Sequence, residues 1–343
     1  MKKILATFMA LTLALLLVTG CSKAPEEVVE DVVAEESEEA VPSEPADPFY
    51  DKVTGKDRPV AVMIDNDADY KGPQSGLENA YMIYEIYVEG GSTRMMALFK
   101  KGFFGEDAPA DTKIGPIRSS RHYFLDFAIE NDAVYAHCGW SPKAQAEISS
   151  RGVNNINGLY DTAPFERYSK YDNSWHNLYT SYDKLDVAAD SKNYRKETNT
   201  SLNYQRNYAV PEEGASGVSV TIPYQQCNIK YNFDAQTGLY ERVRRGEVHT
   251  MQSEKTLPVM NILILEMQNV DLNDGEGKGR QDLYNTGSGN GKYITGGKAI
   301  DITWEKANRD ARTKYLVNGE EIALNPGLTF VQIVPPTLGV TVE

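Results

Sequence analysis

Lys113-Ile-Gly-Pro-Ile-Arg-Ser-Ser-Arg-His122 is a polar turn that leads into a helical pattern, because Tyr123, Phe124 and Phe127 recur at helical spacing. The following segment, Ala133-Val-Tyr-Ala-His-Cys-Gly-Trp-Ser-Pro142, predicts a short buried strand and then a second helix start. Strands and helices that alternate in this way predict an α/β layer with a mixed sheet.

Serines stand at both predicted helix starts. Ser119 or Ser120 is expected to be the N-cap of the first helix, since serine accepts hydrogen bonds from free N–H groups. Ser141 is followed by Pro142, which is the usual order of an N-cap and a first helical residue. The stretch therefore places two helix N-termini close together in the sequence.

The segments before this stretch read as strands. Residues Arg58–Ile64 form an apolar run with a buried-strand pattern, and Asp65-Asn66 lies at its exit. Residues Tyr81–Glu89 and Arg94–Phe99 flank Gly90-Gly91, which predicts a hairpin. After residue 218 the chain is rich in glycine and in alternating β-formers.

These patterns predict an α+β fold. An N-terminal α/β-type domain with a mixed sheet is expected over residues 48–205, followed by a smaller, mostly β domain over residues 218–343. The polar segment between them, which ends Pro211-Glu-Glu-Gly-Ala-Ser-Gly217, is the predicted boundary.

The first twenty residues have the form of a secretory signal. Lys2 and Lys3 precede an apolar run, Ile4–Val18, and Thr19-Gly20 then leads into Cys21. A cysteine at this place resembles a bacterial lipobox, which implies cleavage before Cys21 and a diacylglycerol on its sulfur. No later segment approaches the length of about 20 apolar residues that a spanning helix needs. The sequence therefore predicts an exported protein that is lipid-anchored to the cell membrane on its extracytoplasmic face.

Residues 21–47 are predicted to be a disordered, acidic tether. Ten acidic residues and no basic residue lie between Glu26 and Asp47, and the segment has no aromatic residue. The chain after the signal has 33 basic and 49 acidic residues, a net charge of −16. This balance argues against a nucleic-acid partner, which would need a basic face.

Two cysteines remain after Cys21. Cys138 and Cys227 are 89 positions apart, so the sequence contains no disulfide framework. They can pair only if the fold brings them together, and two separate, mostly buried thiols are the simpler expectation.

Seven motifs recur in the same order in a known protein family. They are Arg58–Asn66, Pro73–Leu77, Val88–Arg94, Ile114–Arg121, His137–Pro142, His176–Tyr179 and Leu324–Phe330. Through these motifs the chain resembles the YerB-like bacterial lipoproteins, a family of unknown function described in an N-terminal and a C-terminal part. The resemblance covers nearly everything after the tether and implies a two-part extracytoplasmic lipoprotein of Gram-positive type. It implies no chemistry, and the family commonly has a small residue at the position of Cys138.

The two predicted helix starts are candidates for an anion-binding site. Free N–H groups and the helix dipole attract anions there, and arginines add bidentate donors. The alternative is that the arginines pair with carboxylates and the serines only cap the helices. The candidate ligand-binding residues are Arg118, Ser119, Arg121, His122, His137, Ser141, His176, Asp65 and Asn66.

Two of the histidines each have a possible functional role and a possible structural role. His137 leaves a buried strand before a helix, where open α/β sheets bind ligands, and can be a general base, a donor, a metal ligand or a satisfied core histidine. His176 lies between Trp175 and Tyr179, which suits either sugar stacking or a structural clamp on a loop.

Cys138 requires a base if it is to act as a nucleophile. Its neighbour His137 points to the opposite face of a strand, so His122 or His176 would have to provide that base. A cysteine-dependent enzyme is therefore a weaker hypothesis than a binding site.

Charged residues near the hairpin also have two interpretations. Glu85 and Glu89 with Arg94 can form the acid–base machinery of a glycan-cleaving enzyme. We favour the alternative, in which both glutamates are exposed and Arg94 pairs with one of them across the hairpin.

The sequence contains no complete metal-binding motif. Asp65, Asp67 and Asp69 have the spacing of a calcium loop, but Tyr70 replaces the required glycine and Gly76 stands where the bidentate glutamate belongs. The four histidines form no zinc motif, although histidines from distant segments can converge on a metal. We therefore predict neither a metal nor a cofactor.

The sequence thus predicts a membrane-anchored extracytoplasmic lipoprotein that binds an anionic or glycan ligand of the cell envelope. One alternative is an envelope hydrolase or transferase that uses a histidine. Another is a protein-interaction scaffold that docks through its β-rich part. The question that decides most is whether Arg118, Arg121, His137 and His176 share one pocket.

Overall fold

The computed structural model describes residues 47–105, 109 and 111–343. The signal peptide over residues 1–20, the lipidation of Cys21 and nearly all of the tether over residues 21–47 fall outside the described residues. The described residues from Asp47 to Glu343 form one compact unit.

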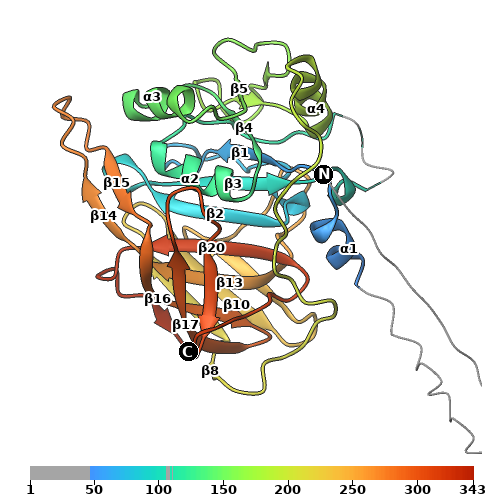
Figure 1. Cartoon of the computed structure of the whole chain (residues 1–343), viewed down its shortest axis with the longest axis vertical. Helices are drawn as coiled ribbons and strands as arrows, with labels where there is room; N and C mark the ends of the chain where they lie inside the picture. The colour runs from blue at the N-terminus through green and yellow to red at the C-terminus, as the bar shows by residue number, and fades with distance from the viewer. Residues whose placement is uncertain (1–46, 106–108, 110) are drawn as a thin grey trace, which may run out of the picture. The chain divides into compact units, whose positions relative to one another are not determined.

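The N-terminal half of this unit alternates strands and helices (Figure 1). Its elements are α1 (Pro48–Thr54), β1 (Val60–Ile64), η1 (Leu77–Asn79), β2 (Met82–Tyr87), η2 (Glu89–Gly91), β3 (Thr93–Phe99), η3 (Lys101–Phe103), α2 (His122–Glu130), β4 (Val134–His137), α3 (Pro142–Ser150), β5 (Asn155–Asn157), β6 (Glu166–Arg167), β7 (Leu178–Tyr179) and α4 (Tyr182–Ser191).

The C-terminal half is built from strands. They are β8 (Ala215–Ser216), β9 (Ser219–Pro223), β10 (Asn228–Asp234), β11 (Leu239–Arg244), β12 (Glu247–Val248), β13 (Val259–Glu266), β14 (Gln268–Asp271), β15 (Gln281–Tyr284), β16 (Gly287–Thr295), β17 (Lys298–Lys306), β18 (Lys314–Val317), β19 (Glu320–Glu321), β20 (Leu328–Val334) and β21 (Thr341–Val342). The predicted α+β fold class, with a strand-rich second part, is confirmed.

Strand β1 lies in the middle of the N-terminal layer. It pairs with β3 antiparallel and with β4 parallel, and β4 continues parallel to β5. All five residues of β1 are buried, because the sheet is covered on both faces. The predicted hairpin is also present, since β2 and β3 pair antiparallel through η2.

Strand β20 makes the sheet continuous from one half of the chain to the other. It pairs parallel with β2 on one side and parallel with β13 on the other. Beyond β13 the sheet continues through β16 and β17 (Figure 1). It ends with β18, which pairs with β17, and β19, which pairs with β18. The boundaries predicted for two separate domains stay a prediction, but the halves share one sheet.

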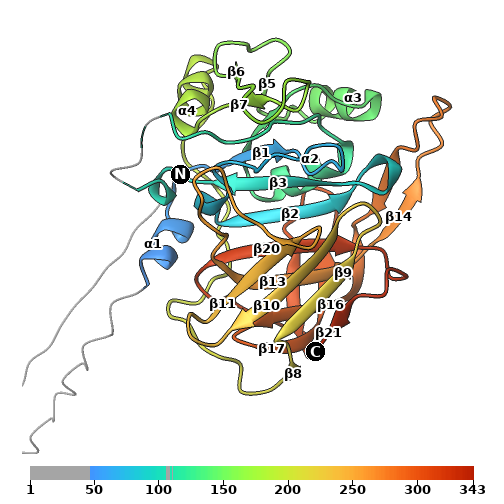
Figure 2. The ribbon, with the colours of Figure 1, turned by 180° about the vertical axis from the view of Figure 1, so that it is seen from behind.

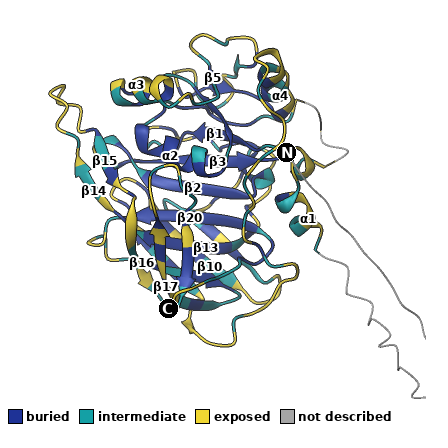
Figure 3. Ribbon diagram, viewed as in Figure 1, coloured by how far each residue is buried: buried dark blue, intermediate teal, exposed yellow. Residues whose placement is uncertain are grey.

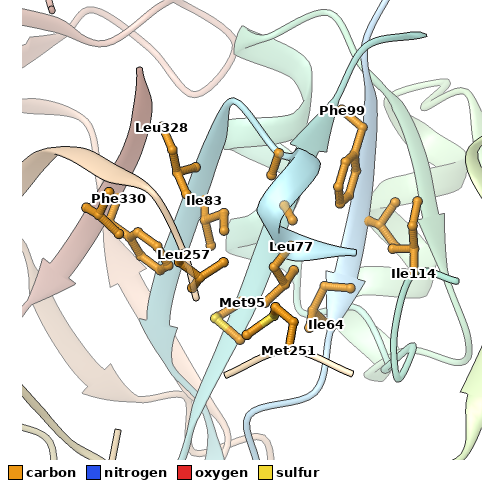
Figure 4. Packing of buried hydrophobic residues seen from close by; sticks show 14 of the residues in the cluster. Ile64, Leu77, Ile83, Met95, Phe99, Ile114, Met251, Leu257, Leu328 and Phe330 are labelled. Atoms are coloured by element: carbon orange, nitrogen blue, oxygen red, sulfur yellow. The ribbon is translucent and has the colours of Figure 1, made fainter. Parts of the chain in front are cut away.

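A second strand layer crosses over the C-terminal half. Strand β11 meets β13 at its start and continues through β10 and β9 to β21, in front of β13 and β16 in Figure 2. Residues from this layer belong to the same buried cluster as one face of the N-terminal strands. Figure 4 shows part of this cluster, in which Met251 and Leu257, between β12 and β13, lie near side chains of β20 and of the N-terminal strands. Helix α2 covers the opposite face of the same strands through Phe124 and Phe127.

The β14–β15 hairpin projects from the body, whereas the central strands are buried (Figure 3). Among the described residues, no helix combines the length and the hydropathy that crossing a membrane requires.

Candidate functional site

The predicted polar turn lies at the carboxyl ends of the parallel strands. The backbone N–H of Arg118 donates to Met63 O in β1 at 2.9 Å, and Arg118 O accepts from Cys138 N after β4 at 3.1 Å. Ser120 N donates to Gly139 O at 3.0 Å. The turn therefore bridges the ends of β1 and β4, at the edge where open α/β sheets bind ligands.

Three of the candidate residues meet at this edge. Asp65 is fully buried, and its Oδ2 lies 3.2 Å from Arg118 Nε and 2.6 Å from His176 Nδ1. Arg118 also reaches Asp67 with Nη2 at 3.1 Å, and its guanidinium lies 4.1 Å from the ring centre of Trp175. The structure thus joins residues that are far apart in the sequence, and Trp175 covers them.

The neighbours of Asp65 and His176 shift the pKa values of both side chains. Burial alone would raise the pKa of Asp65, but the hydrogen bond from His176 and the charge of Arg118 hold it below its ordinary value. The hydrogen bond to Asp65 raises the pKa of His176, against the effect of burial. Asp65 is therefore a buried carboxylate between a guanidinium and an imidazole.

Arg94, at the start of β3, is the neighbouring cation. Only 4% of it is exposed, and its Nη1 donates to the carbonyl of Ser119 at 2.7 Å. Among the described residues, no carboxylate oxygen lies within 4.0 Å of its guanidinium. Burial, and then the charges of Arg121 and Arg118, lower the pKa of Arg94 to about 10. The expected pairing of Arg94 with a glutamate across the hairpin is wrong.

The start of α2 lacks the cap that the sequence predicts. The N-cap residue is Arg121, whose side chain makes no capping bond. Ser120 Oγ instead accepts from Tyr135 OH at 2.9 Å, and Ser119 is half-buried without a capping role. The first N–H groups of α2 therefore lack a side-chain acceptor, which is the state in which a helix start attracts an anion.

Two other candidate residues at this helix start have partners of their own. Arg121 forms a bidentate pair with Glu89, at 2.5 Å from Nε to Oε1 and 2.8 Å from Nη2 to Oε2. His122 Nε2 lies 2.7 Å from Asp282 Oδ1 in β15, so it fixes the projecting hairpin. The structure does not bring these two side chains to the cluster of Asp65, Arg118 and His176.

His137 is buried in the core rather than open to a ligand. Its Nδ1 lies 2.8 Å from Gly139 O, and its ring packs between Tyr135 and Trp140 at 5.1 and 5.7 Å. Its Nε2 is buried without a partner among the described residues. Burial lowers the pKa of His137 to about 4, so this histidine is neutral near pH 7.

Ser141 caps α3 as the sequence predicts, because its Oγ accepts from Ala144 N at 3.3 Å. We expect Ser141→Ala to lower the free energy of unfolding by about 1 kcal/mol, since the helix start then loses its acceptor. Urea unfolding followed by circular dichroism measures this. Ser149→Ala, at an exposed position of the same helix, is the control and should change stability by less than about 0.5 kcal/mol.

Asn66 points away from the cluster, into a polar network between the two halves. Its Nδ2 donates to Glu85 Oε1 at 2.7 Å and to Thr93 Oγ1 at 2.6 Å, and its Oδ1 accepts from Arg244 at 2.7 Å. Glu85 is fully buried, so its predicted exposure on a half-buried strand is wrong.

This network also includes Arg242 and His249, which no motif in the sequence indicated. Arg242 Nη2 donates to Glu85 Oε2 at 2.7 Å, and Arg242 Nη1 lies 2.6 Å from His249 Nδ1. His249 Nε2 lies 2.6 Å from Gln74 Oε1. Glu85 itself could have indicated this buried network in the sequence, because it is a carboxylate within a run of strand residues that is apolar on both faces.

Both remaining cysteines are free thiols. Cys138 is half-buried, and burial raises the pKa of its thiol, which disfavours the thiolate. Within the described residues, no three histidine, cysteine or acidic side chains are placed to hold a metal ion.

These features define a two-part α+β protein in which one mixed sheet joins the parts and a polar site lies at the edge of its parallel strands. The chain belongs to the DUF3048 family, and its resemblance to the YerB-like proteins is confirmed. The model for the N-terminal domain of this protein family of unknown function matches residues 48–195, and the model for its C-terminal domain matches residues 220–331.

One curated relative and one solved structure are similar to the chain over most of its length. The relative is "Putative lipoprotein YerB" of Bacillus subtilis (strain 168), which is 32% identical over 292 residues, or 83% of each chain. The crystal structure of YerB protein from Bacillus subtilis has a TM-score of 0.73 at 29% identity, and the match covers 87% of this chain and 99% of that one.

Proposed function

We propose that the chain is a membrane-anchored extracytoplasmic lipoprotein that binds an anionic glycan or polymer of the cell envelope. In this proposal Cys21 carries the lipid, and the acidic tether after it holds the folded body away from the membrane surface. The signal sequence and the name of the relative in Bacillus subtilis support the anchor. The ligand class rests on the polar site alone.

We infer an anionic ligand from Arg94, a buried arginine without a carboxylate partner among the described residues. Arg118 is held by Asp65 and Asp67, and Arg121 is held by Glu89, so each of these arginines has a carboxylate partner. Arg94 has none among the described residues, although it is almost fully buried. A desolvated cation next to an uncapped helix start is stabilised by an added anion. A phosphate or carboxylate group of a polymer would supply that anion.

Aromatic residues near the site favour a glycan. Trp175, which packs on Arg118, is 60% exposed, and Tyr160, which contacts Trp140 at 5.7 Å, is 70% exposed. Such side chains offer flat faces on which sugar rings stack while their polar groups make hydrogen bonds.

We expect Arg94→Gln to weaken binding of a soluble poly(glycerol phosphate) by about tenfold or more, because a hydrogen bond to a charged group is worth about 1.5–3 kcal/mol. Glutamine keeps an amide donor for Ser119 O. Titration followed by tryptophan fluorescence measures the affinity, since Trp175 is exposed beside the site.

The matched control is Arg206→Gln, which removes the same charge at an exposed position over the ring of Tyr50. It should leave the affinity nearly unchanged, and neutral dextran should bind more weakly than the phosphate polymer to the wild-type protein. Equal affinities of the wild-type and Arg94→Gln proteins for the phosphate polymer would contradict the proposed ligand class.

A further inference from the structure

His176 and Asp65 have the arrangement of an acid–base dyad. The Nδ1–H of His176 donates to Asp65 Oδ2 at 2.6 Å, and the other oxygen of Asp65 accepts from Asp67 N at 2.8 Å. Trp175 and Tyr70 pack on the ring of His176, at 4.4 and 6.0 Å between ring centres. The carboxylate is thus fixed at both oxygens, and the imidazole is oriented by its hydrogen bond and by its aromatic neighbours.

The second ring nitrogen of His176, Nε2, has no hydrogen-bond partner among the described residues, whereas Nδ1 is held by the carboxylate. Because Nδ1 carries the proton, Nε2 presents a lone pair whenever the ring is neutral. This is the arrangement in which a carboxylate orients a histidine that removes a proton from a nucleophile.

The other three histidines differ from it. His122 uses Nε2 for Asp282, and His249 uses both nitrogens, for Arg242 and Gln74. His137 has no carboxylate partner, and its Nε2 is buried. In the described part of the chain, His176 alone combines an oriented Nδ1, an unpartnered Nε2 and an adjacent arginine.

Arg118 links the dyad to the proposed anion site. Its Nε lies 3.2 Å from the same Asp65 oxygen that accepts from His176. Arg94 Nη1 donates at 2.7 Å to the carbonyl of Ser119, the residue that follows Arg118 in the chain. An anion held by Arg94 would therefore lie next to the turn that carries Arg118, whose partner Asp65 also orients the histidine.

We propose that His176, positioned by Asp65, is the general base for hydrolysis of a phosphodiester bound at Arg94, beside the turn that carries Arg118. This inference rests on the proposed function, since it requires an anionic ligand at that site. A guanidinium fits phosphate geometry and stabilises the charge that develops during attack on phosphorus.

The reaction needs only water as a second reactant. Nε2 of neutral His176 takes a proton from water while the water oxygen forms a bond to phosphorus. The bond from phosphorus to one alcohol oxygen breaks, and that oxygen leaves with the electron pair and takes a proton from solvent. The products are a phosphomonoester and a free alcohol, and the imidazolium then returns its proton to solvent.

Glycosidic cleavage fits the same residues less well. It uses two carboxyl groups on opposite sides of the bond, one of them as acid. Asp65 is fully buried, and both Asp65 and Asp67 are engaged by Arg118. A single histidine base beside arginines matches an ester of phosphoric acid instead.

The test uses the purified chain without its signal peptide, with two probes. Bis(para-nitrophenyl) phosphate reports cleavage by colour, and poly(glycerol phosphate) reports it by the release of phosphomonoester ends. We expect His176→Gln to lower kcat by about 100-fold or more while the affinity for the polymer changes little. Asp65→Asn should lower kcat as well, and Asp69→Asn, at an exposed position of the same loop, should not.

The pH profile separates a base from a structural residue. The rate should rise with pH through the pKa of His176, because the base acts in its neutral form, and this pKa lies above the ordinary histidine value. Asp65→Asn should shift the profile to lower pH, since the carboxylate is the main cause that raises this pKa.

The outcomes distinguish this inference from the proposed function. Polymer binding that depends on Arg94, with no turnover of either probe, would overturn the hydrolase inference and leave the binding function intact. Turnover that His176→Gln does not change would also overturn it. Absence of both binding and turnover would overturn the binding function together with the inference.

Discussion

Glu85→Leu is expected to lower the free energy of unfolding by about 3–5 kcal/mol, because it leaves the guanidinium of Arg242 buried without its counter-charge. Glu85 Oε2 accepts from Arg242 at 2.7 Å and from Gln332 at 2.9 Å. Its Oε1 accepts from Asn66 at 2.7 Å and from Thr93 at 2.8 Å. Both charged side chains are fully excluded from solvent, so water cannot replace the lost carboxylate.

Leucine keeps most of the volume of Glu85, so the loss reports the charge rather than a cavity. Urea unfolding at pH 7 measures it. The double variant Glu85→Leu/Arg242→Met is the control, and it should recover part of the loss, because two apolar side chains then replace the ion pair. A loss below about 1 kcal/mol for the single variant would show that Arg242 finds another partner.

The position of this pair explains the size of the effect. Glu85 belongs to β2, Arg242 to β11 and Gln332 to β20, so the carboxylate joins three strands from both halves of the chain. Burial opposes the charge of Arg242, but Glu85 raises the pKa of its guanidinium overall. Removing this carboxylate is therefore expected to break one ion pair and also to weaken the packing between the strand layers.

Local patterns predict the elements of this fold well. The run that becomes β1 is apolar at every position because both faces of the sheet are covered, and the Ser141-Pro142 pair marks the start of α3 as expected. The parallel pairing of β2 with β20 was not predictable in the same way. It joins Met82 to Thr329, and nothing in either short segment specifies a partner so far away in the chain.

The position of the polar cluster was predictable from the sequence, but the pairing of its side chains was not. The residue types at the ends of β1 and β4 indicate a polar edge, and the structure brings Asp65, Arg118 and His176 together there. Which arginine lacks a carboxylate partner depends on the directions of the side chains, and the spacing of residues in the sequence does not determine these directions. Glu89 reaches Arg121 rather than Arg94, because Arg94 lies under the turn and donates to Ser119 O.

His137 gives the second large effect, a loss of stability in mild acid. Its pKa is about 4 in the folded protein because of burial, against an ordinary value of 6.5. Between these pH values the unfolded chain takes up a proton that the folded chain does not. A base whose pKa is lowered by folding therefore contributes stability above about pH 6.5, and this contribution is lost as the pH falls toward 4.

The lost contribution amounts to about 3 kcal/mol, since each unit of pKa shift corresponds to about 1.4 kcal/mol. His137→Phe keeps an aromatic ring between Tyr135 and Trp140 but cannot titrate, and it loses the hydrogen bond to Gly139 O. We expect the variant to be about 1 kcal/mol less stable than wild type at pH 7 and more stable than wild type at pH 4. Urea unfolding at several pH values measures both curves, and groups that titrate equally in the two proteins cancel in their difference. Curves that stay parallel from pH 7 to pH 4 would mean that His137 accepts its proton in the folded state, which would make its Nε2 accessible and return it to the set of ligand-binding candidates.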